Sequence, residues 1–251
     1  MDCSRTLQRG LRLLRPDTQL VWDYLKSSSA LNGFVLVGGT ALSIHLDHRL
    51  SEDLDFMYPD HQLPHQQVEL LKRTAAQDGL PFESKDNPVE VEEFEESGNL
   101  LRDFQQDFLV GETVRLTLVA PESEIRKLLT HDPKSPVRVA TLAEVFRLKC
   151  LACADRTKSR DWLDMYVMLE RGLFPPYEVY RTFELAGATA KFDIAMMRMC
   201  DGKLQPTDEG YASLLDSPPS INEMQAFFRE MKEQIEVEVT RRRISLGHVP
   251  P

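Results

Sequence analysis

Two acidic residues, Asp53 and Asp55, flank Leu54 at the start of a short run that is typical of a β-strand. Alternate residues of a strand point to the same face, about 6.6 Å apart at a rise of ~3.3 Å per residue. Such carboxylates repel one another unless a cation lies between them, and Mg²⁺ prefers oxygen ligands. The spacing therefore predicts a site for one or two magnesium ions, suited to phosphoryl-type displacement. Two solvated acids at a strand end are the alternative.

A glycine pair, Gly38 and Gly39, precedes the acids and separates a predicted strand from a predicted helix. Glycine lets the backbone come close to a bulky anion, and the N–H groups at the helix start point towards it. Thr40 and Ser43 could add hydroxyl groups. A glycine turn used for packing alone is the alternative, and the acids that follow favour anion binding.

One basic residue, Lys149, lies on the apolar side of a helix that is predicted from Thr141 onward. At 100° per residue, that side also carries Leu142, Val145, Ala152 and Cys153. A buried lysine needs a partner, and a nucleotide phosphate is one candidate. A packed stem with its ammonium in water is the other. Arg156 follows two turns later, ~10.5 Å along the helix, so that both cations could face one extended anion.

Asp161 and Asp164 begin the next predicted helix and face one way at a spacing of three. Acids near a helix N-terminus stabilise its dipole. Orientation of Lys149 or of the neighbouring basic residues is favoured over a direct catalytic role. Cys150 and Cys153 have the spacing of a metal or redox pair, but they lie mid-helix without a second pair and are predicted to be core residues.

These residues fall in two regions of different character, residues 1–140 with a mixed sheet and residues 141–251 with helices. The predicted fold class is α+β. An acid-rich segment, residues 83–97, is predicted to be a solvated edge or loop. The expected strands are residues 34–37, 54–57, 104–110, 113–119 and 137–139, with a two-residue connection in the hairpin. The expected helices are residues 5–29, broken near Pro16, then 40–46, 65–76, one from Thr141, 159–170 and 220–239.

The composition excludes several classes of protein. The 251 residues carry 30 Lys and Arg against 40 Asp and Glu, a net charge of −10 that argues against broad binding to nucleic acid. The 4 cysteines form no disulfide framework. No apolar run approaches the ~20 residues of a membrane span, and the first residues lack a secretory signal. The expected location is the cytoplasm, without a membrane partner.

The order Gly-Gly-Thr-Ala-Leu from Gly38, then His-Arg-x-Ser-x-Asp-Leu-Asp-Phe from His48, resembles the abortive-infection (AbiEii-like) nucleotidyltransferase toxins. These belong to the DNA polymerase β-like superfamily. The helical Lys149 and the segment Arg156–Asp164 look like a second block of that family. The resemblance implies a short mixed sheet flanked by helices, with a helical C-terminal region. The residues it assigns to the triphosphate, or to the neutralisation of its charge, are Gly38, Gly39, Thr40, Ser43, Arg49, Ser51, Lys149 and Arg156, with Asp53 and Asp55 on catalytic magnesium.

By this resemblance the chain is a magnesium-dependent enzyme that moves a nucleoside monophosphate from an NTP to a macromolecule and releases pyrophosphate. The resemblance points to a growth-inhibiting toxin with a cognate antitoxin. A tRNA end is one acceptor, which the basic runs 147–160 and 241–243 could grip, and a protein is another. A solvated helix end is the alternative interpretation of those runs.

One position departs from the superfamily pattern. Members usually carry a third acid on a neighbouring strand, and the position aligned with it is Thr117. Without that acid, no obvious base takes the proton of an attacking hydroxyl. The nearest other acids are Asp103, Asp107 and Glu112. The departure keeps a second hypothesis open, a nucleotide-binding or partner-binding module that has lost turnover; a scaffold with neither property is a third.

Overall fold

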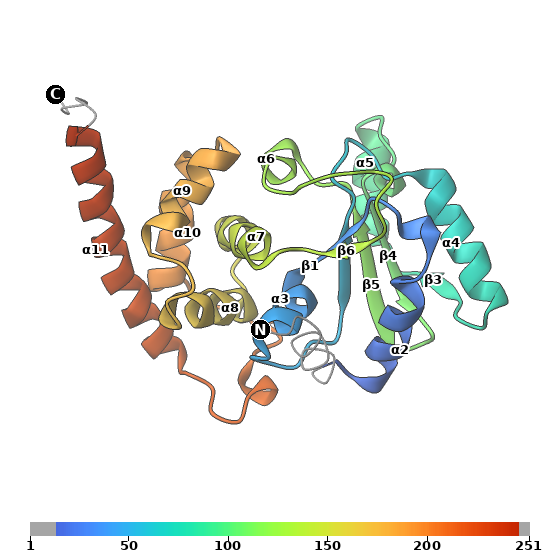
Figure 1. Ribbon diagram of the computed structural model, residues 1–251, viewed down its shortest axis with the longest axis horizontal. Helices are drawn as coiled ribbons and strands as arrows, with labels where there is room; N and C mark the ends of the chain where they lie inside the picture. Colours follow the sequence, from blue (N-terminus) through green and yellow to red (C-terminus); the bar gives the residue numbers. More distant parts are fainter. Residues whose placement is uncertain (1–13, 246–251) are drawn as a thin grey trace. The chain divides into compact units, whose positions relative to one another are not determined.

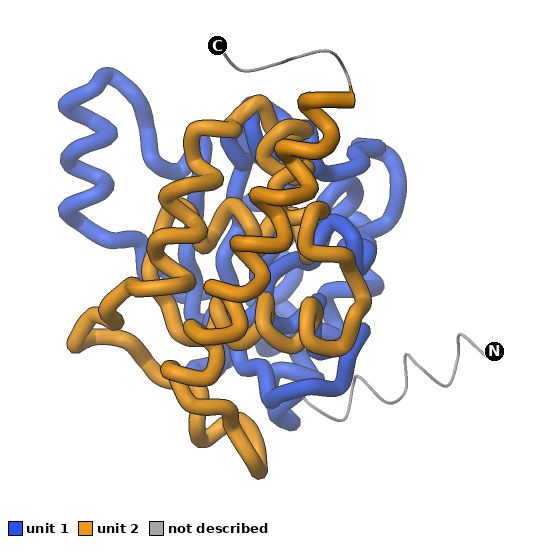
Figure 2. Tube along the Cα trace, turned by 90° about the vertical axis from the view of Figure 1, so that its left-hand side faces the viewer, with its two compact units in different colours: residues 1–145 blue, residues 146–251 orange. Residues whose placement is uncertain are grey.

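The computed structural model describes residues 14–245. The chain forms two compact units, residues 1–145 and residues 146–251, which Figure 2 shows in different colours. Within the described residues, all strands belong to the first unit, and the second unit is helical. The α+β fold class predicted from the sequence is therefore confirmed.

The strands of the described chain form one mixed sheet of six in the order β3-β4-β5-β2-β1-β6 (Figure 1). β2 lies inside this sheet, antiparallel to β1 and parallel to β5. β1 also pairs in parallel with β6, and β4 pairs antiparallel with β3 and β5. The strands are β1 Val35–Val37, β2 Leu54–Met57, β3 Phe82–Ser84, β4 Gln105–Val110, β5 Val114–Val119 and β6 Arg138–Val139.

One face of the sheet is covered by two helices, α2 Pro16–Leu25 and α4 His65–Gln77 (Figure 1). The ring of Trp22 in α2 stacks on Phe56 of β2 at 6.1 Å between centroids. Lys72 of α4 lies 5.8 Å over the ring of Phe108 in β4. Side chains alternate along a strand. The residues next to Phe56 in β2 and next to Phe108 in β4 therefore point to the opposite face of the sheet.

One expectation at the N-terminal end needs correction. The sequence predicts a helix over residues 5–29 with a break near Pro16. The described helix α2 begins at Pro16, in agreement with that break, but it ends at Leu25 rather than at residue 29. Proline suits the first turn of a helix, because its missing N–H would be unsatisfied there anyway. The part of the prediction before residue 14 lies outside the described residues.

The acid-rich segment 83–97 is not a plain loop. It contributes to the edge strand β3 and then forms α5, Pro88–Glu96, which buries none of its residues. Asn87 caps this helix, since its side-chain oxygen accepts a hydrogen bond from the Val89 N–H at 3.1 Å. An asparagine before Pro88 is a start signal that the sequence carried. The predicted exposure and the predicted sheet edge are confirmed, whereas the helix α5 was not predicted.

The hairpin between β4 and β5 is confirmed, with a longer connection than expected. Val110 pairs with Val114, so that three residues rather than two join the strands. Gly111 and Glu112 both have positive φ angles, 58° and 69°. This backbone matches the right-handed twist of paired strands. Thr113 is left over as an extra residue before the ladder begins.

The remaining helices of the first unit include the one that begins at the glycine pair. α3, Gly38–Leu46, follows β1 directly, and α6 is the short helix Ser123–Arg126. α7, Leu142–Asp155, contains the boundary between the two units. Its predicted cap is confirmed: the Thr141 N–H donates to Glu144 Oε2 at 2.8 Å, and the Glu144 N–H donates to Thr141 Oγ1 at 3.2 Å.

In the second unit, α11 packs against three other helices of the same unit. The core of the second unit includes Trp162, Phe183 and Phe228, which come from three different helices and are fully buried. Among the described helices, none has the length and apolarity needed to cross a bilayer. The helices are α8 Ser159–Glu170, α9 Tyr177–Ala186, α10 Ala190–Asp201 and α11 Ile221–Ser245.

Candidate functional site

The carboxylate pair of the first unit lies at and just before β2. Leu54 and Phe56 are fully buried, whereas Asp53 and Asp55 are partly exposed. Asp55 is paired with Val37 of β1 on one side and with Thr117 of β5 on the other. The alternation that the sequence predicted is therefore present, and Asp55 points from the interior of the sheet to the face opposite α2.

Gly38 lies directly beside Asp55, because Asp55 is paired with Val37, the residue that precedes Gly38. Gly38 has a φ of +69°, a conformation that residues with a side chain rarely adopt. A Cβ placed there would lie 2.5 Å from Asp55 Oδ2. The turn therefore requires glycine for two reasons, its backbone angle and the close approach of a carboxylate.

Gly39 makes a similar approach to the segment that follows α3. A Cβ there would overlap the Arg49 guanidinium and would lie 3.3 Å from Ser51 Oγ. Arg49 is 5 % exposed, and its Nη1 donates to the Leu50 carbonyl oxygen at 3.1 Å. The turn thus gathers Arg49, Ser51 and Asp55 around two glycines in one unit.

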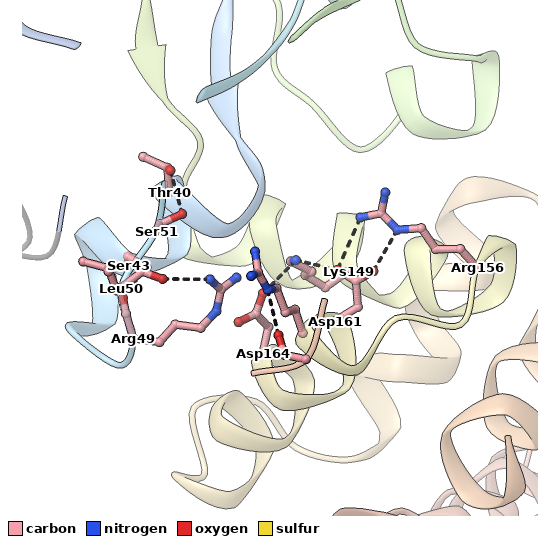
Figure 3. A network of polar contacts seen from close by, with 11 residues as sticks. Thr40, Ser43, Arg49, Leu50, Ser51, Lys149, Arg156, Asp161 and Asp164 are labelled. Carbon is pink, nitrogen blue, oxygen red and sulfur yellow. Dashed lines mark hydrogen bonds and ion pairs between the residues drawn. The ribbon is translucent and has the colours of Figure 1, made fainter. Parts of the chain in front are cut away.

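The hydroxyl groups near the turn hold the chain that leads into β2 (Figure 3). Thr40 Oγ1 shares a 2.8 Å hydrogen bond with Ser51 Oγ and donates to the Asp53 carbonyl oxygen at 2.5 Å. Ser43 Oγ donates to the Arg49 carbonyl oxygen at 3.0 Å. Thr40, Ser43 and Ser51 are buried. These hydroxyls, which the sequence assigned to phosphate, fix the backbone at Arg49 and Asp53 in the structure.

The start of α3 offers backbone N–H groups to a ligand. Val37, the residue before the helix, provides no side-chain cap. The first N–H groups of a helix have no partner within it, and with the helix dipole they favour an anion. The geometry therefore fits a phosphate at the glycine turn through backbone atoms.

The neighbouring strands place a second acid on the same face as Asp55. Thr117 of β5 is paired with Asp55 on one side and with Asp107 of β4 on the other. Its hydroxyl donates to Asp107 Oδ1 at 2.6 Å. Of the three acids named as nearest alternatives, Asp103 pairs with His65 at 2.9 Å and Glu112 lies in the hairpin turn. Asp107 is the one aligned with Asp55 across the sheet.

Within residues 14–245, no group of three or more His, Cys, Asp or Glu side chains is arranged to hold a metal ion. Asp53 and Asp55 provide two carboxylates. Mg²⁺ is often bound by one or two carboxylates together with substrate phosphates and water. The donor set of this face therefore suits a hard cation that arrives with a phosphate ligand.

The second unit holds a different group of charges, which Figure 3 shows around Lys149. Its Nζ lies 2.6 Å from Asp161 Oδ1 and 2.7 Å from Asp164 Oδ2. The Lys149 side chain is 7 % exposed, and those of Asp161 and Asp164 are 3 % and 0 % exposed. The expectation that these acids orient Lys149 agrees with the contacts, and its ammonium does not extend into water.

Arg156 is joined to the same group. Its Nε lies 2.8 Å from Asp161 Oδ2, and its side chain is 53 % exposed. Burial alone would raise the pKa of Asp161, but the nearby Lys149 and Arg156 outweigh it and lower that pKa. Asp161 therefore stays ionised between two cations. Cys150 and Cys153 are buried, and burial raises the pKa of the Cys150 thiol to about 12, as expected of core residues.

Sequence reasoning missed an aromatic and basic groove between α9 and α11. The Arg242 guanidinium lies 3.8 Å over the ring of Tyr177, and Arg243 Nη2 donates to the Tyr180 hydroxyl at 3.1 Å. The groove has a volume of about 390 Å³ and is also lined by Glu184. The arginine run was visible in the sequence, but its tyrosine partners lie about 60 residues away and no local pattern joins them.

Comparison with known proteins places the chain in a family. The model of the family described as "Nucleotidyl transferase AbiEii toxin, Type IV TA system" matches residues 20–243. The chain belongs to this family of nucleotidyltransferase toxins from type IV toxin–antitoxin systems, and the resemblance noted in its sequence is confirmed. A comparison with curated protein sequences gives no significant match.

Two solved structures are similar to the chain. JHP933 from Helicobacter pylori is 17 % identical, with a TM-score of 0.48, and the match covers 91 % of this chain and 94 % of that one. A candidate nucleotidyltransferase from H. pylori is 16 % identical, with a TM-score of 0.46, covering 94 % of this chain and 98 % of that one.

Proposed function

We propose that the chain moves a nucleoside monophosphate from an NTP to a hydroxyl group of a macromolecule and releases pyrophosphate. The observation that carries this proposal is the face of the first unit where Asp53 and Asp55 meet the glycine turn. Two partly exposed carboxylates lie there beside an uncapped helix start. That combination suits a cation and a polyphosphate together.

Magnesium fits the residues that are present. Gly38 leaves open the space that a Cβ would fill against Asp55 Oδ2. Asp53 and Asp55 would hold the ion through oxygen atoms, which Mg²⁺ prefers. When bound, it would stabilise the charge that develops on the transferring phosphoryl group.

The chain's own groups would bind and orient the nucleotide. The N–H groups at the start of α3 would take phosphate oxygens, and Arg49 would add positive charge beside Gly39. Thr40 and Ser51 would act indirectly, by holding the backbone at Asp53. For Lys149 and Arg156, phosphate binding stays a prediction, since their contacts given above are to carboxylates of the second unit.

For the acceptor we propose RNA, with tRNA as the first candidate. The supporting observation is the groove of the second unit, where Tyr177 and Tyr180 adjoin Arg242 and Arg243. Aromatic rings that stack on bases, beside arginines that contact phosphates, are typical of single-stranded RNA sites. A local site of this kind is compatible with a net charge of −10. We also propose a cognate antitoxin as a partner, as the toxin–antitoxin family implies.

The proposal is tested by incubating the purified protein with each α-labelled NTP, Mg²⁺, total tRNA and a protein extract. We expect label to enter an RNA band with the wild type and not with the Asp53→Asn, Asp55→Asn double variant. Glu52→Gln is the matched control, because this neighbouring acid pairs with Arg15 instead. Label in a protein band would replace RNA by a protein acceptor, and equal labelling by the double variant would refute the metal assignment.

A second function is favoured by one observation, the threonine opposite Asp55. A site with Thr117 in place of a third acid could bind a nucleotide without turning it over. Calorimetry separates the two functions: tight NTP binding with no pyrophosphate release over hours would indicate a binding module.

A further inference from the structure

The transfer reaction requires a group that takes the proton of the attacking hydroxyl. A positioned base contributes typically 10²–10⁴-fold to such a step. Asp53 and Asp55 are poor choices, because a carboxylate that holds a cation is a weaker base. The strand next to Asp55 supplies a hydroxyl, Thr117, in place of a carboxylate. The group that finally takes the proton must therefore lie on the far side of Thr117 from Asp55.

Asp55, Thr117 and Asp107 form a row across three adjacent strands. Asp55 on β2 pairs with Thr117 on β5, and Thr117 pairs with Asp107 on β4. Neighbouring strands lie ~4.8 Å apart, and residues directly opposite one another point to the same face. Each of the three is partly exposed, whereas Phe56, Leu116 and Phe108, one position along, are buried on the other face. The row is therefore on the side open to a ligand.

The contact between Thr117 and Asp107 has the form of a proton path. The Thr117 hydroxyl donates to Asp107 Oδ1 at 2.6 Å, a short hydrogen bond between a hydroxyl and a carboxylate. A threonine oxygen that donates its own proton still has lone pairs to accept another. These lone pairs are available to a hydroxyl bound near Asp55.

Asp107 is itself held in place. Gln105 Nε2 donates to its Oδ2 at 2.7 Å, and its backbone N–H donates to Asp86 Oδ1 at 2.8 Å. The first bond leaves Oδ1 directed at Thr117. A fixed carboxylate one hydroxyl away from the reacting centre is suited to receive a proton without moving.

We infer that Thr117 and Asp107 act as a proton relay in the transfer reaction, which rests on the function proposed above. The acceptor oxygen forms a bond to the α-phosphorus, and the bond to the bridging oxygen breaks as pyrophosphate leaves with its electron pair. The proton of the acceptor hydroxyl passes to Thr117 Oγ1. The proton of Thr117 passes to Asp107 Oδ1.

The relay is tested with three variants and one control, using pyrophosphate release from NTP, Mg²⁺ and total tRNA. Thr117→Val keeps the shape and removes the hydroxyl, and Asp107→Asn keeps an oxygen for Thr117 but cannot take a proton. Each is expected to lower kcat about 100-fold or more while the KM for NTP changes less than threefold. Thr117→Ser is expected to retain most of kcat.

The control separates chemistry from hairpin stability. Val110→Ala removes buried side-chain volume from the same hairpin, on the opposite face. It is expected to lower the melting temperature and to leave kcat unchanged. Asp107→Asn and Thr117→Val are expected to lower kcat and to leave the melting temperature close to that of the wild type. In mixtures of H₂O and D₂O, the wild-type rate should curve with deuterium fraction, because two protons move in one step.

Wild-type kcat in Thr117→Val and Asp107→Asn would overturn the relay and leave the transferase standing. The relay would also be overturned if Val110→Ala lowered kcat as much as Thr117→Val and Asp107→Asn do for the same loss of melting temperature. Absence of transfer by the wild type would refute the proposed function and the relay together.

Discussion

Each unit contains a pair of aspartates, and the two pairs have opposite surroundings. Asp161 and Asp164 of the second unit are buried and both contact Lys149. Asp53 and Asp55 of the first unit are partly exposed and adjoin a glycine turn whose helix has no side-chain cap. A buried acid that is matched by a cation of its own unit fixes local structure, whereas a partly exposed acid at an open helix start is placed to bind a ligand.

The largest expected effect is on stability in the second unit. Lys149→Ala would leave Asp161 and Asp164 buried with one cation fewer, and such unpaired charge typically costs about 3–5 kcal/mol. Thermal and urea unfolding of the variant would measure this loss. A free energy of unfolding within about 1 kcal/mol of the wild type would show that the cluster is not a structural unit.

A second variant controls for charge. Lys149→Met combined with Asp164→Asn removes one positive and one negative charge, so that Arg156 and Asp161 still balance. We expect this variant to recover a large part of the lost stability. It is then the form in which the predicted phosphate role of Lys149 can be tested by NTP affinity.

The next effect is on activity in the first unit. Gly38→Ala would place a Cβ against Asp55 Oδ2 and would require a positive φ of an alanine. We expect a loss of transfer of about 100-fold, because small displacements of catalytic groups have effects of this order. Destabilisation should be about 1–2 kcal/mol. Gly79→Ala is the control, since it has a similar φ of +82° and open space for its Cβ. Equal losses of activity in both variants would contradict this role of Gly38.

The smallest effect concerns Glu144, a paired carboxylate of the first unit. Burial would raise its pKa, but hydrogen bonds from Arg138, Thr130 and Thr141 outweigh this and lower the pKa from 4.5 to about 2. Because the folded-state pKa is the lower one, its stabilisation is present above pH ~4.5 and is lost as the pH falls towards 2.

We expect this loss to be about 2 kcal/mol, less than the full shift implies, because Arg138 is 30 % exposed. Unfolding free energies between pH 5 and pH 2 would measure it. Glu144→Gln should be less stable at pH 5 and should lose less stability on acidification. Parallel curves for the variant and the wild type would contradict the lowered pKa.

The predictions that succeeded depend on local patterns. The strand at residues 54–57, the helix at residues 159–170 and the cap at Thr141 follow from alternation, helical period and capping residues. The contact of Asp161 with Lys149 could be predicted because the helices that carry them, α8 and α7, follow one another in the sequence. The helix α5 was missed because a high density of acids outweighed the start signal at Asn87.

What the sequence could not provide was the pairing of distant segments. The alignment of Asp107 with Asp55 depends on the register of two strand pairs, and register is set by packing and turn geometry over the whole sheet. The contacts of Arg242 and Arg243 with tyrosines of α9 arise in the same way. The acids of the candidate site could be predicted from the sequence, but the residues that are paired with them across the sheet could not.

The central claim is that Asp53 and Asp55 make the first unit a magnesium and NTP site. The most direct test is calorimetry of NTP binding with and without Mg²⁺, for the wild type, the Asp53→Asn, Asp55→Asn variant and the Glu52→Gln control. We predict binding that requires Mg²⁺, is lost in the double variant and is retained in the control. NTP binding by the double variant with wild-type affinity and the same Mg²⁺ dependence would contradict the claim.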